Sequence, residues 1–142
     1  MCYCDGSWKK YKGAGIGYII YKQGRLVCYK SSQVVACDSF EAECLALKEA
    51  IDHVTHLGLT SCTFYTDCKV LAKECTLNDD HMDMAKIDVV LYIKKRLSEI
   101  RKYKCKHVGR LQNQDADMLA KIERIKSWTN YVGYTYPILF KC

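Results

Sequence analysis

The sequence predicts an α/β domain built on a mixed β-sheet. Three strand-like segments come first, and two further strands then alternate with helices along the rest of the chain. This order is typical of a five-stranded sheet that begins as three antiparallel strands and continues in parallel strands flanked by helices. The chain has 142 residues, of which 49% are hydrophobic, so it is long enough to bury one core.

The first three strands are expected at Cys2 to Trp8, Gly15 to Lys22 and Leu26 to Val35. The second segment is rich in Ile and Tyr, and the third alternates apolar with polar residues. Gln23 and Gly24 provide a two-residue turn between them. These features predict an antiparallel meander.

A long helix is expected next. Asp38 or Ser39 can cap its N-terminus, Glu41 can complete a capping box, and Gly58 ends it. Apolar residues recur at helical spacing and predict its buried face. They are Phe40, Cys44, Leu47, Ile51 and Val54.

The remaining elements alternate in type as far as residue 125, and the segment 126–142 is an aromatic tail. We assign residues 1–125 to one domain and interpret the tail as a packed extension or a flanking segment. The expected elements are a strand from Ser61 to Thr66, a helix from about Cys68 to Cys75, an acidic loop from Asn78 to Asp83, a helix from about Ala85 to Arg101, a strand from Tyr103 to Val108, and a helix from Leu111 to Arg124 that Asn113 opens.

The composition disfavours several classes of protein. No apolar run reaches the roughly 18 residues that cross a bilayer, and Met1 to Gly6 does not resemble a signal peptide. There are ten cysteines but no C-x-x-C pair. Five of them fall inside apolar elements, where a thiol behaves as a small hydrophobic group. We therefore expect free thiols in a reducing compartment, the cytoplasm or nucleus, and neither a zinc site nor a disulfide scaffold. These five are Cys28, Cys44, Cys62, Cys75 and Cys105.

Positive charge gathers in one stretch of the chain. The formal net charge is +6, and between Lys94 and Lys106 the basic residues are opposed only by Glu99. Such a run is either a solvated helix face or a surface for a polyanion. Lys94, Lys95 and Arg96 are its candidates for nucleic-acid contact.

Four carboxylates lie where local structure explains them poorly. Asp5 is inside a strand, Glu43 borders the apolar face of the long helix, Asp67 follows a strand, and Asp117 shares a first helical turn with Asp115. Each alone can be interpreted as a turn, a cap or a helix-dipole residue. Gathered together, they would need a positive partner, because burying unpaired charge costs several kcal/mol.

Magnesium is the natural partner for such a set. It prefers oxygen ligands and binds a few carboxylates together with waters and phosphates. Two such ions about 4 Å apart can activate a water and stabilise the leaving oxygen of a phosphodiester. The residues alone therefore indicate a nuclease site, with the basic run beside it to bind the polyanion.

The motifs of this chain resemble those of ribonuclease H, over roughly residues 1 to 125. The branch most similar to it is the compact one of reverse-transcriptase-associated and plant-type domains. The motifs occur in the family's order. They are Cys4-Asp5-Gly6-Ser7, Gly13-Ala14-Gly15-Ile16-Gly17, Glu41-Ala42-Glu43, Tyr65-Thr66-Asp67, His107-Val108-Gly109-Arg110, and Asn113 to Ala120.

The resemblance implies a ribonuclease H-like fold and a catalytic, metal-binding tetrad of Asp5, Glu43, Asp67 and Asp117. It implies hydrolysis of the RNA strand of an RNA/DNA hybrid with two Mg²⁺ ions, for which Mn²⁺ could substitute. It assigns His107 a catalytic role in product release or proton transfer. It also places four residues near the RNA strand, which the family reads through its 2′-hydroxyls. They are Gly6, Ser7, Ser39 and Ala42.

The chain departs from the family at three places. Asp38-Ser39-Phe40 stands where members often have a polar run such as Thr-Asn-Gln, and no N-terminal hybrid-binding module is expected. The connection before the helix at Ala85 is short and acidic, where some members carry a basic, Trp-containing protrusion. The contacts that bind the substrate must therefore come from Lys94 to Lys106 or from a partner domain. The other histidines, His53, His56 and His81, match no motif and are expected at the surface.

Three hypotheses follow for function. The first is a ribonuclease H, either a small cellular protein or the ribonuclease H domain of a retroelement reverse transcriptase, with an RNA/DNA hybrid as partner. The alternative is a catalytically decayed nucleic-acid-binding module of the same fold. The third, an integrase or junction resolvase, is disfavoured by the Asp-Gly-Ser start and the loop from His107 to Asp117. A monomer is expected, with no membrane partner.

Overall fold

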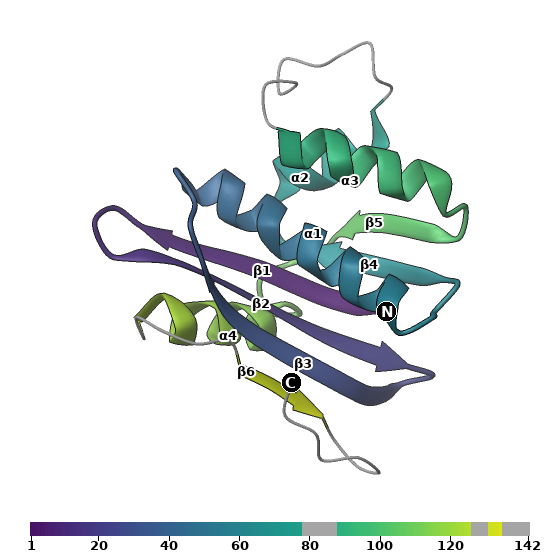
Figure 1. Cartoon of the computed structure of the whole chain (residues 1–142), viewed down its shortest axis with the longest axis horizontal. Helices are drawn as coiled ribbons and strands as arrows, with labels where there is room; N and C mark the ends of the chain where they lie inside the picture. Colours follow the sequence, from purple (N-terminus) through teal and green to yellow (C-terminus); the bar gives the residue numbers. More distant parts are fainter. Residues whose placement is uncertain (78–87, 126–130, 135–142) are drawn as a thin grey trace.

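A central β-sheet organises the molecule. The structure is a computed structural model that describes residues 1–77 and 88–125, together with the backbone of 131–134. Within these residues the sheet has six strands in the order β5-β4-β1-β2-β3-β6 (Figure 1). The strands are β1 (Cys2–Lys9), β2 (Gly13–Lys22), β3 (Arg25–Val34), β4 (Cys62–Thr66), β5 (Tyr103–His107) and β6 (Tyr131–Tyr134).

The predicted five-stranded mixed sheet is confirmed. β1, β2 and β3 form the antiparallel meander, whereas β4 pairs parallel with both β1 and β5. The turn at Gln23 and Gly24 is as expected, since both residues have the positive φ of a type I′ hairpin turn. The tail contributes one strand that the sequence did not predict, because β6 pairs antiparallel with β3.

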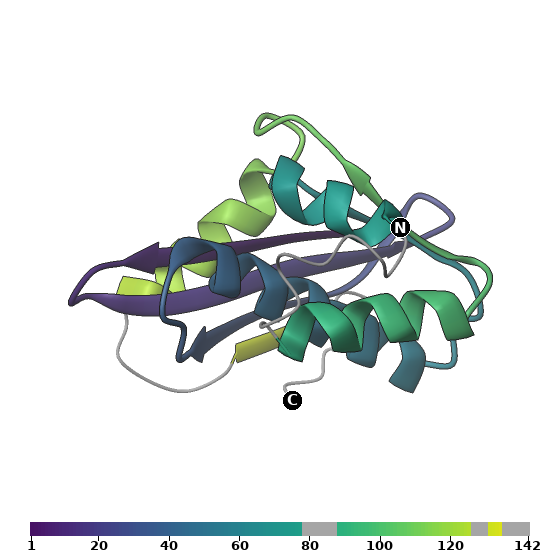
Figure 2. The same cartoon turned by 90° about the horizontal axis from the view of Figure 1, so that it is seen from above.

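Helices cover both faces of the sheet (Figures 1 and 2). α1 packs on β1, β2 and β4, and α3 packs outside α1, whereas α4 lies across β1, β2 and β3. None of the described helices is long and apolar enough to cross a membrane. The helices are α1 (Ser39–His56), α2 (Lys69–Thr76), α3 (Asp88–Glu99) and α4 (Gln114–Ile125).

Local sequence signals fix the ends of α1. The Asp38 carboxylate accepts a hydrogen bond from the Glu41 N–H at 2.7 Å, and Glu41 Oε1 accepts one from the Cys37 N–H at 3.2 Å. At the other end Gly58 has a φ of +77°, which favours glycine. The predicted start and end of this helix are therefore confirmed. The helix predicted from Leu111 begins later, at Gln114.

The main core lies between the sheet and α1. The predicted buried residues of α1 are buried except Phe40, which is partly exposed, and six cysteines are buried free thiols. No disulfide links the cysteines of the described residues. Four of the five cysteines expected inside apolar elements are therefore small hydrophobic core groups, whereas the fifth, Cys75, is only partly buried. The six are Cys2, Cys4, Cys28, Cys44, Cys62 and Cys105.

One surface prediction among the histidines is wrong. His53 is half-buried, its Nδ1 lies 2.7 Å from the Tyr18 hydroxyl, and its Nε2 lies 3.9 Å from Cys28 Sγ. A histidine on the edge of the apolar face of α1 can find partners on the sheet, which the motif search did not consider. His56 is exposed, as expected, and His81 lies outside the described residues.

Two glycines let α4 approach the opposite face of the sheet. A Cβ at Gly15 would meet the backbone of Ala120, and one at Gly17 would lie 2.6 Å from the Ala116 carbonyl oxygen. Both contacts are shorter than any real Cβ contact, so side chains here would push α4 away. The alternating glycines are therefore a packing surface for α4.

Candidate active site

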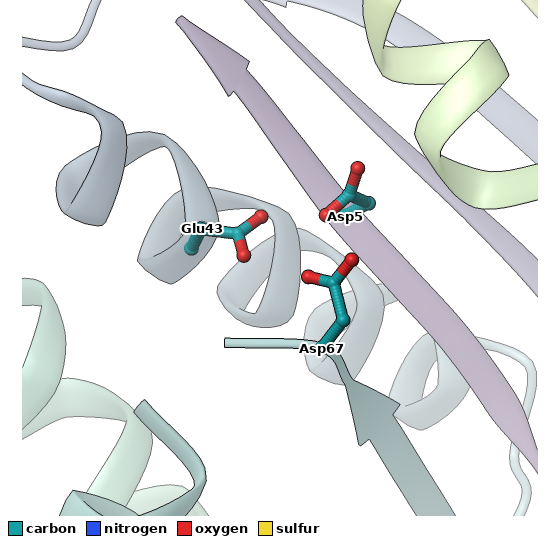
Figure 3. A group of neighbouring side chains, drawn as sticks. All are labelled: Asp5, Glu43 and Asp67. Carbon is teal, nitrogen blue, oxygen red and sulfur yellow. The ribbon is translucent and has the colours of Figure 1, made fainter. Parts of the chain in front are cut away.

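Three carboxylates from separate elements converge at one point. Asp5 lies in β1, Glu43 lies in α1, and Asp67 directly follows β4. Each offers an oxygen such that these atoms all lie within 4.8 Å of one another (Figure 3). Carboxylate oxygens at this spacing can share one hard cation.

The parallel pairing of β1 with β4 places two of these residues together. Tyr3 is in register with Tyr65, so Asp5 and Asp67 each lie two residues further along neighbouring strands. The Thr66 hydroxyl then accepts a hydrogen bond from the Cys68 N–H at 3.1 Å, which turns the chain out of the sheet at Asp67. The carboxyl end of a parallel strand is where sites of α/β folds are commonly built.

Glu43 reaches the site because β1 crosses the start of α1 closely. A Cβ at Gly6 would overlap the backbone between Ala42 and Glu43. With glycine at this position, the Gly6 N–H donates directly to Glu43 Oε1. Gly6 therefore orients the second carboxylate through its backbone.

The fourth carboxylate arrives from the other face of the sheet. Asp5 is paired in register with Gly17, the residue that lets Ala116 of α4 come close. Asp117 is the next residue, and its carboxyl group interacts with that of Asp5 closely enough to shift the pKa of both. The Lys121 ammonium, one turn further along α4, lies 2.7 Å from Asp117 Oδ2.

All four carboxylates line one hollow of about 610 Å³, here called the acidic hollow. Gly6 and Ser39 also line it, as do two cationic side chains, Arg110 and Lys121. The predicted tetrad is therefore brought together by the fold. Its members are Asp5, Glu43, Asp67 and Asp117.

The electrostatics of the acidic hollow favour a bound cation. Burial raises the pKa of Asp5 well above its ordinary value, and repulsion by Glu43 raises it further. Burial also raises the pKa of Glu43, although hydrogen bonds from Asp5 and from the Gly6 N–H partly offset this. For Asp117 burial acts in the same direction, but hydrogen bonds to Asp5 and Lys121 outweigh it and lower the pKa. A divalent cation would supply the positive charge that Asp5 and Glu43 otherwise lack.

The predicted RNA-contacting residues separate into two groups. Gly6 and Ser39 line the acidic hollow, so they are accessible beside the carboxylates. The Ser7 hydroxyl accepts a hydrogen bond from Arg124 Nε at 2.8 Å, and the Ala42 side chain is completely buried. Neither Ser7 nor Ala42 is among the residues that line this hollow.

His107 lies near the site but does not line it. It is the exposed last residue of β5 and is in register with Thr66, directly before Asp67. The following Val108 N–H donates to the Thr66 carbonyl at 2.9 Å. The loop after β5 then brings Arg110, not His107, to the acidic hollow.

The predicted basic triplet on α3 is not a uniform exposed face. Lys94 is buried, with 8% of its surface exposed. Lys95 and Arg96 both contact Glu99, at 4.0 Å and 3.5 Å. Lys94 and Lys95 line a second hollow of about 920 Å³ together with Lys104 and Lys106 of β5, and none of these four lines the acidic hollow.

The structural role of one supporting residue was not predicted from the sequence. Asn113, expected only to open the last helix, is completely buried, and its Nδ2 donates to the Cys4 carbonyl at 2.9 Å. The backbone carbonyl of Asn113 accepts a hydrogen bond from the Asp117 N–H at 3.0 Å. Asn113 therefore joins the start of α4 to the residue before Asp5. No local pattern reveals a contact between residues so distant in sequence.

Lys121 was also missed, although its signal was readable. A lysine four residues after an aspartate on a helix lies on the same face and can pair with it.

Solved structures with the same fold include RNase H1 proteins and a viral protease-reverse transcriptase. The RNase H1 of the halophilic archaeon Halobacterium salinarum aligns at a TM-score of 0.75 and 20% identity, covering 89% of this chain and 97% of that one. LC11-RNase H1 in complex with an RNA/DNA hybrid aligns at 0.76 and 19% identity, covering 90% and 98%. The foamy viral protease-reverse transcriptase in complex with an RNA/DNA hybrid aligns at 0.69 and 17% identity, covering 87% of this chain and 19% of that one.

Sequence comparison places the chain in a family. A search of curated proteins gave no significant match. The sequence profile described as reverse transcriptase-like, however, matches residues 3–122, which include all four carboxylates. The chain therefore has the ribonuclease H fold and belongs to the reverse transcriptase-like family.

Proposed function

We propose that this protein is a metal-dependent endoribonuclease that hydrolyses the RNA strand of RNA/DNA hybrids. One observation carries the proposal: four carboxylates from β1, α1, the end of β4 and α4 line a single hollow. No structural need of the fold explains that arrangement, because mutual repulsion and burial both disfavour it.

The residues present fit a site for Mg²⁺, with Mn²⁺ as a substitute. Asp5, Glu43 and Asp67 offer closely spaced oxygens, and Asp117 adds a fourth carboxylate beside Asp5. When bound, two such ions would activate a water and stabilise the leaving oxygen of a phosphodiester.

The protein's own part is to hold these groups rigid. The Gly6 N–H orients Glu43, and Asn113 fixes the start of α4 against β1. Preorganised ligands avoid reorganisation when the substrate reacts. We infer that Arg110, at the edge of the acidic hollow, attracts the phosphate backbone.

The substrate is inferred from the related complexes. Both LC11-RNase H1 and the foamy viral reverse transcriptase were solved with an RNA/DNA hybrid. In this chain Gly6 and Ser39 border the acidic hollow, and we infer that they contact the RNA strand. We infer that His107, at the neighbouring strand end, acts when the product leaves.

The biological setting is part of the same proposal. The matched portion is about a fifth of the foamy viral chain, which supports a role beside a reverse transcriptase domain. Free thiols at all nine described cysteines support a reducing compartment, the cytoplasm or nucleus. We propose that the domain acts as a monomer.

The test is cleavage of an RNA/DNA hybrid labelled on the RNA strand. Mg²⁺ or Mn²⁺ is added, with EDTA, duplex DNA, duplex RNA and single-stranded RNA as controls. We expect metal-dependent cutting of the RNA strand in the hybrid alone, and none by Asp5→Asn. A folded protein that binds the hybrid but cuts it with neither metal would instead be a decayed binding module.

A further inference from the structure

Among the four carboxylates, Asp117 differs in its electrostatic environment. The Lys121 ammonium lies 2.7 Å from its Oδ2, whereas no ion pair joins Asp5, Glu43 or Asp67 to any cation of the described residues. Asp117 is also outside the group of three whose oxygens lie within 4.8 Å of one another. The acidic hollow therefore contains one carboxylate with an internal counter-ion and three without one.

The Lys121 side chain is exposed enough to move away from Asp117. Its side chain is 54% exposed, and that of Asp117 is 36% exposed. An ion pair this accessible to water contributes little stability, because solvent screens it and the long side chain loses entropy when held. The lysine therefore has room to move out of the acidic hollow.

A divalent cation and the Lys121 ammonium would compete for the same carboxylate. A cation bound between Asp5 and Asp117 would lie a few ångströms from the ammonium, and like charges at that range repel strongly. Asp5 and Asp117 line the same hollow, and Gly17, which is in register with Asp5, lets the residue before Asp117 come close, so both carboxylates can face one cation.

We propose that Lys121 is the counter-ion of Asp117 in the metal-free protein and is displaced when a divalent cation binds between Asp5 and Asp117. Lys121 is thus a positioning residue, because it acts through Asp117. It raises the metal concentration that is needed to occupy the site between Asp5 and Asp117. The inference rests on the proposed function, because it takes the four carboxylates to be a metal site.

The experiment measures metal binding without substrate. Mn²⁺ is titrated into the whole protein, and the free ion is followed by electron paramagnetic resonance. Lys121→Gln and Lys121→Ala remove the charge, and Lys121→Arg keeps it. Lys48→Gln is the matched control, because Lys48 forms the same kind of pair with Asp52, at 3.0 Å on α1, and does not line the acidic hollow.

We expect both neutral variants to bind the Mn²⁺ ion between Asp5 and Asp117 about threefold to fivefold more tightly than the unmodified protein does. This is the range of affinity that loss of an exposed ion pair can supply. Lys121→Arg and Lys48→Gln should bind it unchanged, and Asp117→Asn should lose it. Mg²⁺ should then raise the melting temperature of Lys121→Gln at lower concentration than that of the unmodified protein.

Unchanged or weaker Mn²⁺ binding by both neutral variants would overturn the inference and leave the proposed function intact. An unmodified protein that binds no divalent ion would overturn both. The two failures are distinguishable, because only the second is visible without any substitution.

Discussion

In the metal-free fold, the carboxyl group of Asp5 lies close to those of Glu43 and Asp117. Burial and repulsion by Glu43 raise its pKa, so the folded chain keeps a proton that the unfolded chain releases above about pH 4. A folded pKa above the unfolded value stabilises the fold at low pH. That contribution is lost progressively as the pH rises from about 4 toward the folded pKa.

Asp5→Asn should therefore stabilise the metal-free protein relative to the unmodified one, and more so at higher pH. Melting in EDTA, measured between about pH 5 and about pH 8, should show the difference in melting temperature growing with pH. Added Mg²⁺ should stabilise the unmodified protein more than the variant. A difference independent of pH would mean that Asp5 is ionised in the metal-free fold.

Single residues also show what the sequence could and could not predict. The four carboxylates were recognisable because each lies awkwardly in its own element, and Gly24 and Gly58 were recognisable from turn chemistry. The contact that Asn113 makes was not predictable, because its partner is the Cys4 carbonyl at the opposite end of the domain. Interactions within one helix, strand or turn can be predicted from the sequence, whereas a contact between distant elements depends on the fold.

At the scale of elements, the contact between α4 and β2 determines where Asp117 lies. Gly17 faces α4 and is in register with Asp5, so the depth of this helix sets the distance between the two carboxylates. The glycine spacing was visible in the sequence. Its role as a helix-packing surface needed the strand register, which follows only from the paired strands.

Gly17→Ala should displace α4 and impair the acidic hollow. We expect a loss of about 1–3 kcal/mol in unfolding free energy, as for other overpacked cores, together with weaker Mn²⁺ binding and slower cleavage. Gly58→Ala is the matched control. It strains a residue with a φ of +77° and open space around it, at the far end of α1, for about 1–2 kcal/mol. Equal cleavage by the two variants, measured well below their melting temperatures, would contradict this role of Gly17.

The basic run between Lys94 and Lys106 divides between two elements. On α3, Lys94 is buried and both Lys95 and Arg96 contact Glu99, whereas Lys104 and Lys106 are exposed on β5. The charge run alone could not show this, since burial depends on how α3 packs on α1 and α2. If the proposed function is correct, contact with a hybrid is therefore better assigned to Lys104 and Lys106 of β5 than to the start of the run.

Replacing both Lys104 and Lys106 with Gln should weaken hybrid binding and flatten its salt dependence. Two lost phosphate contacts reduce the slope of log affinity against log salt by about 1.5 to 2. Fluorescence anisotropy in the Asp5→Asn background measures this without cleavage. An unchanged slope would leave these lysines the simpler role of protecting an edge strand from pairing with other chains.

For the whole molecule, the order of strands and helices was predictable because the hydrophobic period changes clearly from strand to helix along the chain. The exception is β6, which pairs with β3 from beyond the domain boundary expected at residue 125. Four residues with a glycine among them carry too weak a pattern to identify a strand. Their pairing depends on the free edge that β3 offers, which is a property of the assembled sheet.

Removing residues 126–142 should therefore expose the edge of β3. The four carboxylates lie outside the deleted segment, so Mn²⁺ binding should persist. An uncovered strand edge can pair with another chain, so size-exclusion chromatography with light scattering should show self-association that grows with concentration. A truncated chain that stays monomeric at high concentration would show that β6 is not needed to cover β3.

The four carboxylates come from the beginning, the middle and the end of the described chain. During synthesis on the ribosome, Asp5, Glu43 and Asp67 emerge well before α4, which carries Asp117 and Lys121. A nascent chain, or one cut by a protease before α4, therefore lacks the complete set of four. If the proposed function is correct, nuclease activity therefore begins only after α4 has been synthesised and has packed on the sheet.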